Sequence, residues 1–162
     1  MESLLRDKLL STDDASLLRE CRLDFFRASG HGGQKVNKTS SAARLTHIPT
    51  GLSASSQESR SQLENRNKTL RRLRLKIAFE IRGNAPAPSL DSIPSERNPA
   101  YPLFVAALLD AMAEASWDLK AAAESLGASP SKLAKTLYRD PDLWQETNRQ
   151  RAALSLSPLK SP

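Results

Sequence analysis

The sequence has few of the residues that build metal centres and disulfide frameworks. Its 162 residues include one cysteine, Cys21, and two histidines, His31 and His47, which lie far apart in the sequence. One cysteine cannot form an internal disulfide, and no spacing typical of zinc ligands is present. We therefore expect neither a metal ion nor an organic cofactor.

Long apolar runs are also missing. A membrane helix needs roughly 20 consecutive apolar residues, and no stretch of this sequence approaches that length. The first ten residues are too charged for a secretory signal peptide. These absences favour a soluble, cytoplasmic protein, for which we expect a monomer. The length suits one ordinary domain or two small ones.

Positive charge is concentrated in the middle of the chain. Residues 22–82 hold thirteen Lys or Arg and four Asp or Glu, whereas residues 1–21 carry a net charge of −2 and residues 83–162 a net charge of −1. Such a block favours a phosphate backbone as the partner. A solvated basic surface without a partner is the alternative.

The first part of the chain predicts an α+β fold with a small β-sheet. Residues 11–14, Ser-Thr-Asp-Asp, predict the capped start of a short helix. Residues 22–28 predict a strand. Residues 43–48 and 52–57 predict a β-hairpin, because Pro49 and Gly51 between them fit a type I turn.

A long basic helix is expected from Ser59 onward. Its apolar stripe comprises Leu63, Leu70, Leu73, Ile77 and Ile81. We expect this stripe to pack against the sheet and the arginines, Arg74 among them, to face outward. The core is expected to include Phe25, Phe26 and Phe79.

Composition divides the chain into two units. Residues 83–99 contain four prolines among small polar residues, which predicts a linker. The linker separates an N-terminal domain, residues 1–82, from an all-α unit at residues 100–155. A flexible tail is expected at residues 156–162.

Within the second unit, helices are expected at residues 119–126 and 130–138. They are joined through Gly127, with Ser129 as the N-cap and Pro130 at the first helical position. This pair is helix-turn-helix-like.

A glycine-rich segment separates the first strand from the hairpin. Residues 30–33 contain three glycines, and Gln34, Lys35 and Lys38 follow them. Glycine permits a positive φ and close approach of the backbone, and bare N–H groups suit an oxygen-rich ligand. The pattern alone leaves two interpretations open, a flexible surface loop and a phosphate-binding turn.

From about Leu23 to Ile77 the sequence resembles the catalytic domain of class I peptide chain release factors and of related ribosome-rescue peptidyl-tRNA hydrolases. The matching segments are Arg27-Ala28-Ser29-Gly30, Gly32-Gly33-Gln34, Val36-Asn37-Lys38, Ser41-Ala42, Thr46-His47-Ile48-Pro49-Thr50-Gly51 and Glu58-Ser59-Arg60-Ser61-Gln62, with Asn65. His31 stands where that family usually has a small residue or proline.

The resemblance implies that Gly32, Gly33 and Gln34 are catalytic. In similar proteins the two glycines let the main-chain N–H of the glutamine reach the reacting ester, and the glutamine side chain helps to select water. Placed water and stabilised negative charge are what ester hydrolysis needs. The implied partners are peptidyl-tRNA and the ribosome, through large-subunit ribosomal RNA, which supply the remaining groups.

Supporting roles divide by chemistry. Candidate contacts to ribosomal RNA phosphates are Lys35, Lys38, Arg60, Arg66, Arg71 and Arg72. For each of these cations a solvated helix face is the alternative. Residues expected to support the loop are Arg27, Ser29, Gly30, Asn37, Ser41 and Gln62.

The sequence has no length to spare for domains that read a stop codon, so we expect codon-independent hydrolysis, as in ribosome rescue. The helical unit stands where rescue hydrolases usually carry a tail dense in Lys and Arg, and we expect it to target the protein. The alternative is a non-catalytic RNA- or DNA-binding protein that uses the basic helix together with Lys132, Lys135 and Arg139 of the helix-turn-helix-like unit. A region of net charge −1 is a poor partner for DNA.

Overall fold

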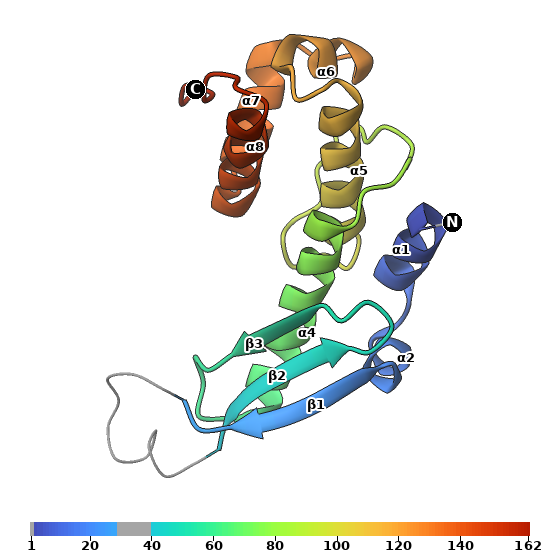
Figure 1. Cartoon of the computed structure of the whole chain (residues 1–162), viewed down its shortest axis with the longest axis vertical. Helices are drawn as coiled ribbons and strands as arrows, with labels where there is room; N and C mark the ends of the chain where they lie inside the picture. Colours follow the sequence, from blue (N-terminus) through green and yellow to red (C-terminus); the bar gives the residue numbers. More distant parts are fainter. Residues whose placement is uncertain (1, 29–39) are drawn as a thin grey trace. The chain divides into compact units, whose positions relative to one another are not determined.

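A computed structural model describes residues 2–28 and 40–162 of the chain (Figure 1). It contains two compact units. Lys8–Glu80 form one, here called the sheet unit, and Met1–Asp7 together with Ile81–Pro162 form the other, here called the helical unit. No helix within the described part of the chain is both long enough and apolar enough to cross a membrane.

The sheet unit has the expected α+β composition. Its three strands form an antiparallel sheet in the order β1-β2-β3, and one long helix lies along a face of that sheet (Figure 1). Among the described residues, the elements that lie wholly in this unit are α2 (Asp14–Arg19), β1 (Cys21–Phe26), β2 (Ala42–His47), β3 (Ser53–Ser56) and α4 (Gln62–Glu80). Asp13 caps α2, as the sequence predicts, by accepting a hydrogen bond from the Ser16 amide.

The β2–β3 hairpin confirms the predicted hairpin, with a wider turn. The Gly51 amide donates to the His47 carbonyl over 2.8 Å, so the turn closes across five residues instead of four. Gly51 has φ of 72°, a conformation that glycine adopts at little cost. At the other end of β2, Ala42 pairs with Phe26 of β1. The glycine-rich segment is therefore the connection between two paired strands.

The core of the sheet unit lies between α4 and strands β2 and β3. Leu45, Leu73 and Ile77 are fully buried there. The expectation that Phe25 belongs to the core is wrong, because its side chain is 40% exposed. Phe25 lies on the edge strand β1, whereas α4 packs across β2 and β3.

Leu63 is a second correction, since it is 58% exposed. In the first turns of α4 the buried position belongs to Asn65. Two residues are about 200° apart around a helix, so Leu63 points nearly opposite to Asn65.

Arg74 is a third correction, because it is buried and does not face outward. Its guanidinium donates to the carbonyls of Leu9, Leu10 and Thr12 over 3.1, 3.3 and 2.6 Å, and to the Asp14 carboxylate over 2.9 Å. These partners satisfy the charge without water, so the side chain can be buried. Arg74 thus joins α4 to the N-terminal part of the sheet unit.

The helical unit contains the two helices that the sequence predicts at residues 119–126 and 130–138, together with two others. They are α5 (Tyr101–Glu114), α6 (Leu119–Ser125), α7 (Pro130–Tyr138) and α8 (Pro141–Ala153). Asp118, Ser129 and Asp140 cap three of them with side-chain acceptors. Gly127, with φ of 64°, lies in the turn between α6 and α7.

Residues near the start of the helical unit gather around one buried carboxylate. Asp110 of α5 accepts from Arg6 over 2.7 Å, and from the amides of Gly83 and Ala85 over 2.9 and 3.2 Å. Arg6 belongs to α1 (Glu2–Ser11), a helix that the sequence did not predict, and its side chain is fully buried. Asp110 therefore joins α5 to Arg6, which lies 104 positions earlier in the chain.

The segments expected to be a linker and a tail also make contacts in the helical unit. Residues 83–99 have neither helix nor strand, but Leu90 is buried and Asp91 pairs with Lys132. After α8 the chain turns back, because the Leu159 amide donates to the Asn148 side chain over 2.7 Å.

Candidate functional site

The structure describes the two ends of the glycine-rich segment. Arg27, which follows β1, is exposed, and Ser41, which precedes β2, is buried. The predicted catalytic residues Gly32, Gly33 and Gln34 lie outside the described residues, as do the predicted loop residues Ser29, Gly30 and Asn37 and the RNA-binding candidates Lys35 and Lys38. Their roles stay predictions, and what the structure adds is the framework that receives the segment at Ser40 and Ser41.

Two amide side chains of α4 bind the end of this segment. Gln62 donates to the Ser40 carbonyl over 2.8 Å, and Asn65 donates to the Ser41 carbonyl over 2.7 Å. Gln62 was expected in this role, and its contact is with Ser40, the neighbour of the predicted Ser41. Because both amides come from the first turn of one helix, the start of α4 fixes the end of the segment.

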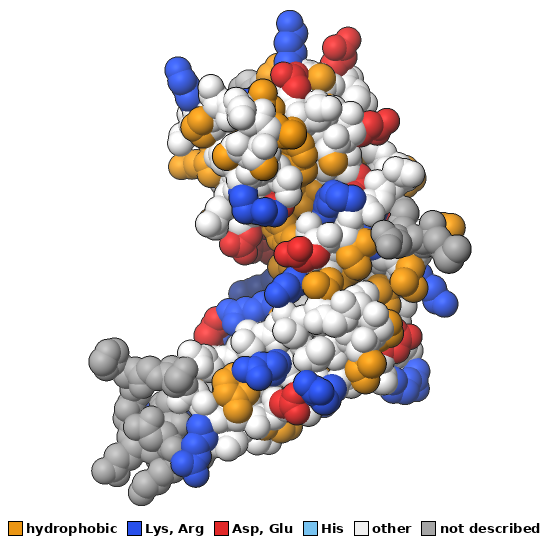
Figure 2. Space-filling model, in the orientation of Figure 1, with side chains coloured by type: hydrophobic (Ala, Val, Ile, Leu, Met, Phe, Trp, Pro, Cys, Tyr) orange, Lys and Arg blue, Asp and Glu red, His pale blue; other side chains and the backbone are white. Residues whose placement is uncertain are grey.

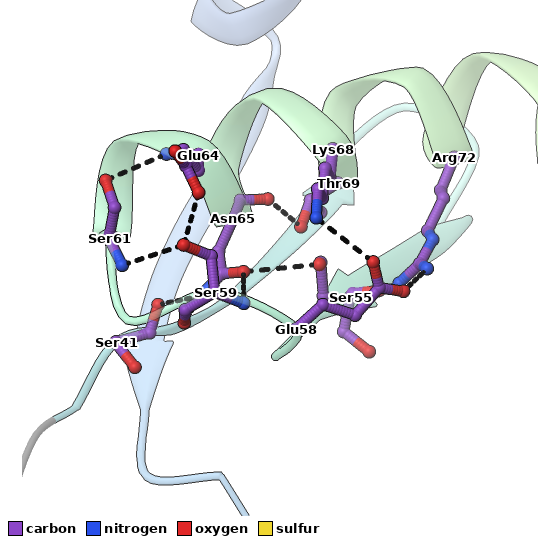
Figure 3. A network of polar contacts seen from close by, with 11 residues as sticks. Ser41, Ser55, Glu58, Ser59, Ser61, Glu64, Asn65, Lys68, Thr69 and Arg72 are labelled. Carbon is purple, nitrogen blue, oxygen red and sulfur yellow. Dashed lines mark hydrogen bonds and ion pairs between the residues drawn. The ribbon is translucent and has the colours of Figure 1, made fainter. Parts of the chain in front are cut away.

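The start of α4 is itself fixed by an N-cap at Ser61, whose own amide donates to the Ser59 hydroxyl over 3.1 Å. The Glu64 amide donates to the Ser61 hydroxyl over 3.2 Å, while the Ser59 hydroxyl donates to the Glu64 carboxylate (Figure 3). The spacing Ser61-Gln62-Leu63-Glu64 is the sequence signature of such a helix start. It determines where Gln62 and Asn65 lie on the first turn.

Asn65 is the most completely bonded polar side chain of the site (Figure 3). It is fully buried, and besides the Ser41 contact its Nδ2 donates to the Ser59 carbonyl over 2.7 Å. Its Oδ1 accepts from the Ser59 amide over 3.0 Å and from the Ser56 hydroxyl over 3.4 Å. An asparagine amide has two donors and two acceptor lone pairs, so every one of them has a partner.

Basic side chains surround this framework but differ in how they are engaged. Figure 2 shows Lys and Arg spread over the viewed face of the sheet unit. Arg60 and Arg71 are exposed, and Arg66 is half-buried. The Nε of Arg66 is buried without a hydrogen-bond partner among the described residues. Arg44, also exposed, lies 4.9 Å from the centre of the Phe26 ring, a cation–π distance.

Arg72 has a structural role that the sequence did not suggest. Its guanidinium donates to the Ser55 carbonyl over 2.9 Å and pairs with Glu58, which also binds Lys68 over 3.2 Å (Figure 3). The hydrogen bond from Arg72, followed by that from Lys68, lowers the pKa of the Glu58 carboxyl. Arg72 therefore joins α4 to β3, and Glu58 offsets part of the charge that could face a phosphate.

The buried histidine belongs to a different cluster. His47 places Nδ1 2.8 Å from the Thr50 hydroxyl and Nε2 3.1 Å from the Glu20 carboxylate. The Thr50 hydroxyl also accepts a hydrogen bond from the Leu52 amide over 3.3 Å. The cluster joins the hairpin turn to the end of α2, at the end of β2 away from Ala42.

Sequence reasoning missed the central position of Asn65 in this site. The residue contributed to the family resemblance, but no role was assigned to it. A signal was available, since a polar residue in the sheet-facing position of an amphipathic helix must find partners when it is buried. The sequence contained no comparable signal that Glu58 would pair with Arg72.

Comparisons with known proteins agree with this framework. The family model described as the RF-1 domain matches residues 17–97. The chain is 58% identical over 59 residues to peptide chain release factor 1 of Leptospira biflexa, a match that covers 36% of this chain and 17% of that protein. It is 49% identical over 67 residues to peptide chain release factor 1 of Enterococcus faecalis, covering 41% of this chain and 19% of the relative.

A third relative is named as a peptide chain release factor 2. Peptide chain release factor 2 of Thermomicrobium roseum is 49% identical over 71 residues, which are 43% of this chain and 19% of the relative. The chain thus spans less than a fifth of the length of these curated relatives. Since the RF-1 model covers half of the chain, the chain belongs to the family of the class I release factor catalytic domain.

Proposed function

We propose that the chain hydrolyses the ester bond of peptidyl-tRNA on the ribosome, with Gly32, Gly33 and Gln34 as the reacting segment. The observation that carries the proposal is the anchored end of this segment, where Gln62 and Asn65 bind the carbonyls of Ser40 and Ser41. Membership of the release-factor family supports the type of chemistry. A reacting loop must be held in one place to align water with an ester.

The chemistry places few demands on side chains of this protein. Water attacks the ester carbonyl carbon, negative charge develops on the carbonyl oxygen, and the tRNA hydroxyl leaves. A main-chain N–H of Gln34 would stabilise that charge, which is the task of an oxyanion hole. We assign the positioning of tRNA and the exclusion of bulk water to the ribosome.

The basic surface of the sheet unit supports a ribosomal partner. Arg60 and Arg71 are exposed, with no ion pair to a described residue, and are the first candidates for contact with ribosomal RNA phosphates. Arg72, in contrast, is shared with Glu58 and Ser55. Its loss should affect the sheet unit as well as RNA binding.

The finer proposal is that hydrolysis needs no stop codon. The RF-1 match ends at residue 97, and the described residues that follow it are the helices of the helical unit. We assign this unit to targeting of the protein and not to codon reading or ester chemistry. The protein would then act on ribosomes whose decoding site is empty or holds a sense codon, as ribosome rescue requires.

The test compares release of labelled peptide from ribosomes that carry a stop codon, a sense codon or no codon in the decoding site. Free peptidyl-tRNA without ribosomes is the control, and we expect no hydrolysis of it. Similar release from the three complexes supports the proposal, and strict dependence on a stop codon contradicts codon independence. Tight RNA binding with no release from any complex would favour a non-catalytic RNA-binding protein.

A further inference from the structure

The position of the reacting segment depends on where the chain enters β2. The register pairs Phe26 with Ala42, which brings the first and last residues of the connection together. Strand pairing ends at Ala42, so the position of Ser41 depends on the hydrogen bonds that Ser41 itself makes. In the structure, the contact of the buried Ser41 carbonyl is the amide of Asn65.

Asn65 connects three chain segments through one planar group. Its amide binds Ser41 at the end of the reacting segment, Ser56 at the end of β3, and both backbone groups of Ser59 before α4. All of these contacts are at least partly buried. A water molecule cannot easily replace the amide, and unpaired groups would remain if it were removed.

The neighbouring Gln62 contact is different in kind. The bond from Gln62 to the Ser40 carbonyl is exposed, so water can take the place of either partner with little loss of free energy. The two amides therefore have unequal weight. Gln62 adds to the attachment, whereas Asn65 determines it.

The backbone of Asn65 is itself held in place. The Thr69 hydroxyl lies 2.6 Å from the Asn65 carbonyl and 3.3 Å from the Ala43 carbonyl on β2, and is buried with them. The Asn65 amide donates to the Ser61 carbonyl over 3.0 Å in the capped first turn. A site is placed accurately when the residues that support it are fixed by packing and hydrogen bonds of their own.

We propose that Asn65 is a positioning residue for peptide release. By holding the Ser41 carbonyl against α4, it sets the place from which the segment with Gly32, Gly33 and Gln34 reaches the ester. The inference rests on the proposed function, because it assigns Asn65 a part in that reaction. Asn65 acts through the backbone and does not touch the substrate.

The test uses the full-length chain with Asn65→Asp, which keeps the shape of the side chain. An aspartate has at most one donor even when protonated, so at least one of the carbonyls of Ser41 and Ser59 loses its partner. The matched control is Arg74→Met. It removes a buried hydrogen-bonding group of the same helix, about 13.5 Å further along α4, whose partners are Leu9, Leu10, Thr12 and Asp14.

Single-turnover release is measured at saturating and at limiting protein, well below the unfolding temperatures of both variants. We expect Asn65→Asp to lower the saturating rate at least about 10-fold, with the half-saturating concentration changed less than twofold. Arg74→Met should release peptide within about twofold of the wild-type rate although it is less stable. If Asn65→Asp does not fold, the same comparison is made with Asn65→Ser.

Wild-type release by the Asn65 variants, or a loss no greater than that of Arg74→Met, would overturn the inference. Failure of the proposed function looks different, because then the wild-type chain itself releases no peptide. In that case amide hydrogen exchange over residues 40–44 tests the anchoring alone. Exchange should be faster in Asn65→Asp and unchanged in Arg74→Met, and equal exchange in all three proteins would contradict it.

Discussion

Replacing Asp110 by alanine should destabilise the helical unit strongly. The Asp110 side chain is 5% exposed, and the Arg6 side chain that it pairs with is fully buried. Alanine removes the carboxylate that faces this guanidinium. It also removes the acceptor of the Gly83 and Ala85 amides.

The magnitude follows from what remains around Arg6. Leaving one partner of a buried ion pair alone costs about 3–5 kcal/mol. Arg6 keeps the Asp7 carboxylate at 2.7 Å and the Ile81 carbonyl at 3.1 Å, so we expect the lower end, about 3 kcal/mol. With a urea m value of about 1.5 kcal/mol per M, the midpoint should fall by roughly 2 M.

Tryptophan fluorescence during urea unfolding measures this unit selectively, because Trp117 and Trp144 are the only tryptophans of the chain and both belong to it. Glu114→Ala, an exposed carboxylate at the end of α5, is the matched control. We expect the control to move the midpoint by less than about 0.3 M. A shift for Asp110→Ala as small as that of the control would refute the assignment of Asp110 as the centre of the cluster.

The same carboxyl should make stability depend on pH. Burial would raise the pKa of Asp110, but the hydrogen bonds from Arg6 and the amides of Gly83 and Ala85 outweigh burial and lower it. A carboxyl with a lowered folded-state pKa stabilises the fold above its unfolded pKa of about 3.9. That stability is lost as the pH falls through the folded-state pKa. The urea midpoint of the wild type should therefore decrease as the pH is lowered below about 4. The decrease should be smaller in Asp110→Ala.

Two further predictions concern the helical unit. Thr147 is fully buried, and its hydroxyl has no hydrogen-bond partner among the described residues. Thr147→Val should therefore raise the free energy of unfolding by about 1 kcal/mol, measured by the same fluorescence. A loss of stability would instead show that the hydroxyl has a partner. Removing residues 84–162 should raise the half-saturating protein concentration for release and leave much of the saturating rate, and unchanged ribosome affinity would exclude the targeting role.

Local signals predicted much of the fold correctly. The Asp13 cap, the hairpin around Gly51 and the turn at Gly127 each depend on residues within a few positions of one another. Such signals are contained in short windows of sequence, because caps and turns are made by neighbouring residues. The start of α7, with Ser129 as its N-cap and Pro130 at the first helical position, followed from such signals.

Buried charges could not be predicted in this way. Arg6 and Arg74 are buried because distant parts of the chain supply partners for them. Asp110 binds Arg6, and the carbonyls of Leu9, Leu10 and Thr12 bind Arg74. A window of sequence contains none of these partners, so arginine is expected at the surface. The exposed Phe25 has the same origin, since sequence does not say which strand lies at the edge.

In the candidate site, too, some features could be predicted from the sequence and others depend on segments that only the fold brings together. The resemblance supplied the predicted reacting residues and the expected supporting role of Gln62, whose side chain binds the Ser40 carbonyl in the structure. The partners of Asn65, in contrast, come from the end of the reacting segment, from β3 and from the turn before α4. Only the folded arrangement of these segments shows that one amide serves all of them.

The most direct test of the account is the single-turnover rate of peptide release by Gly33→Ala beside the wild type. Removing one oxyanion-stabilising donor typically lowers the rate 10²–10³-fold, and a Cβ at Gly33 should misplace the Gln34 N–H, so we expect a loss of at least about 100-fold with unchanged stability. His31→Ala, the neighbouring control, should keep most of the rate. Equal rates for Gly33→Ala and wild type would contradict hydrolysis through the Gly-Gly-Gln segment.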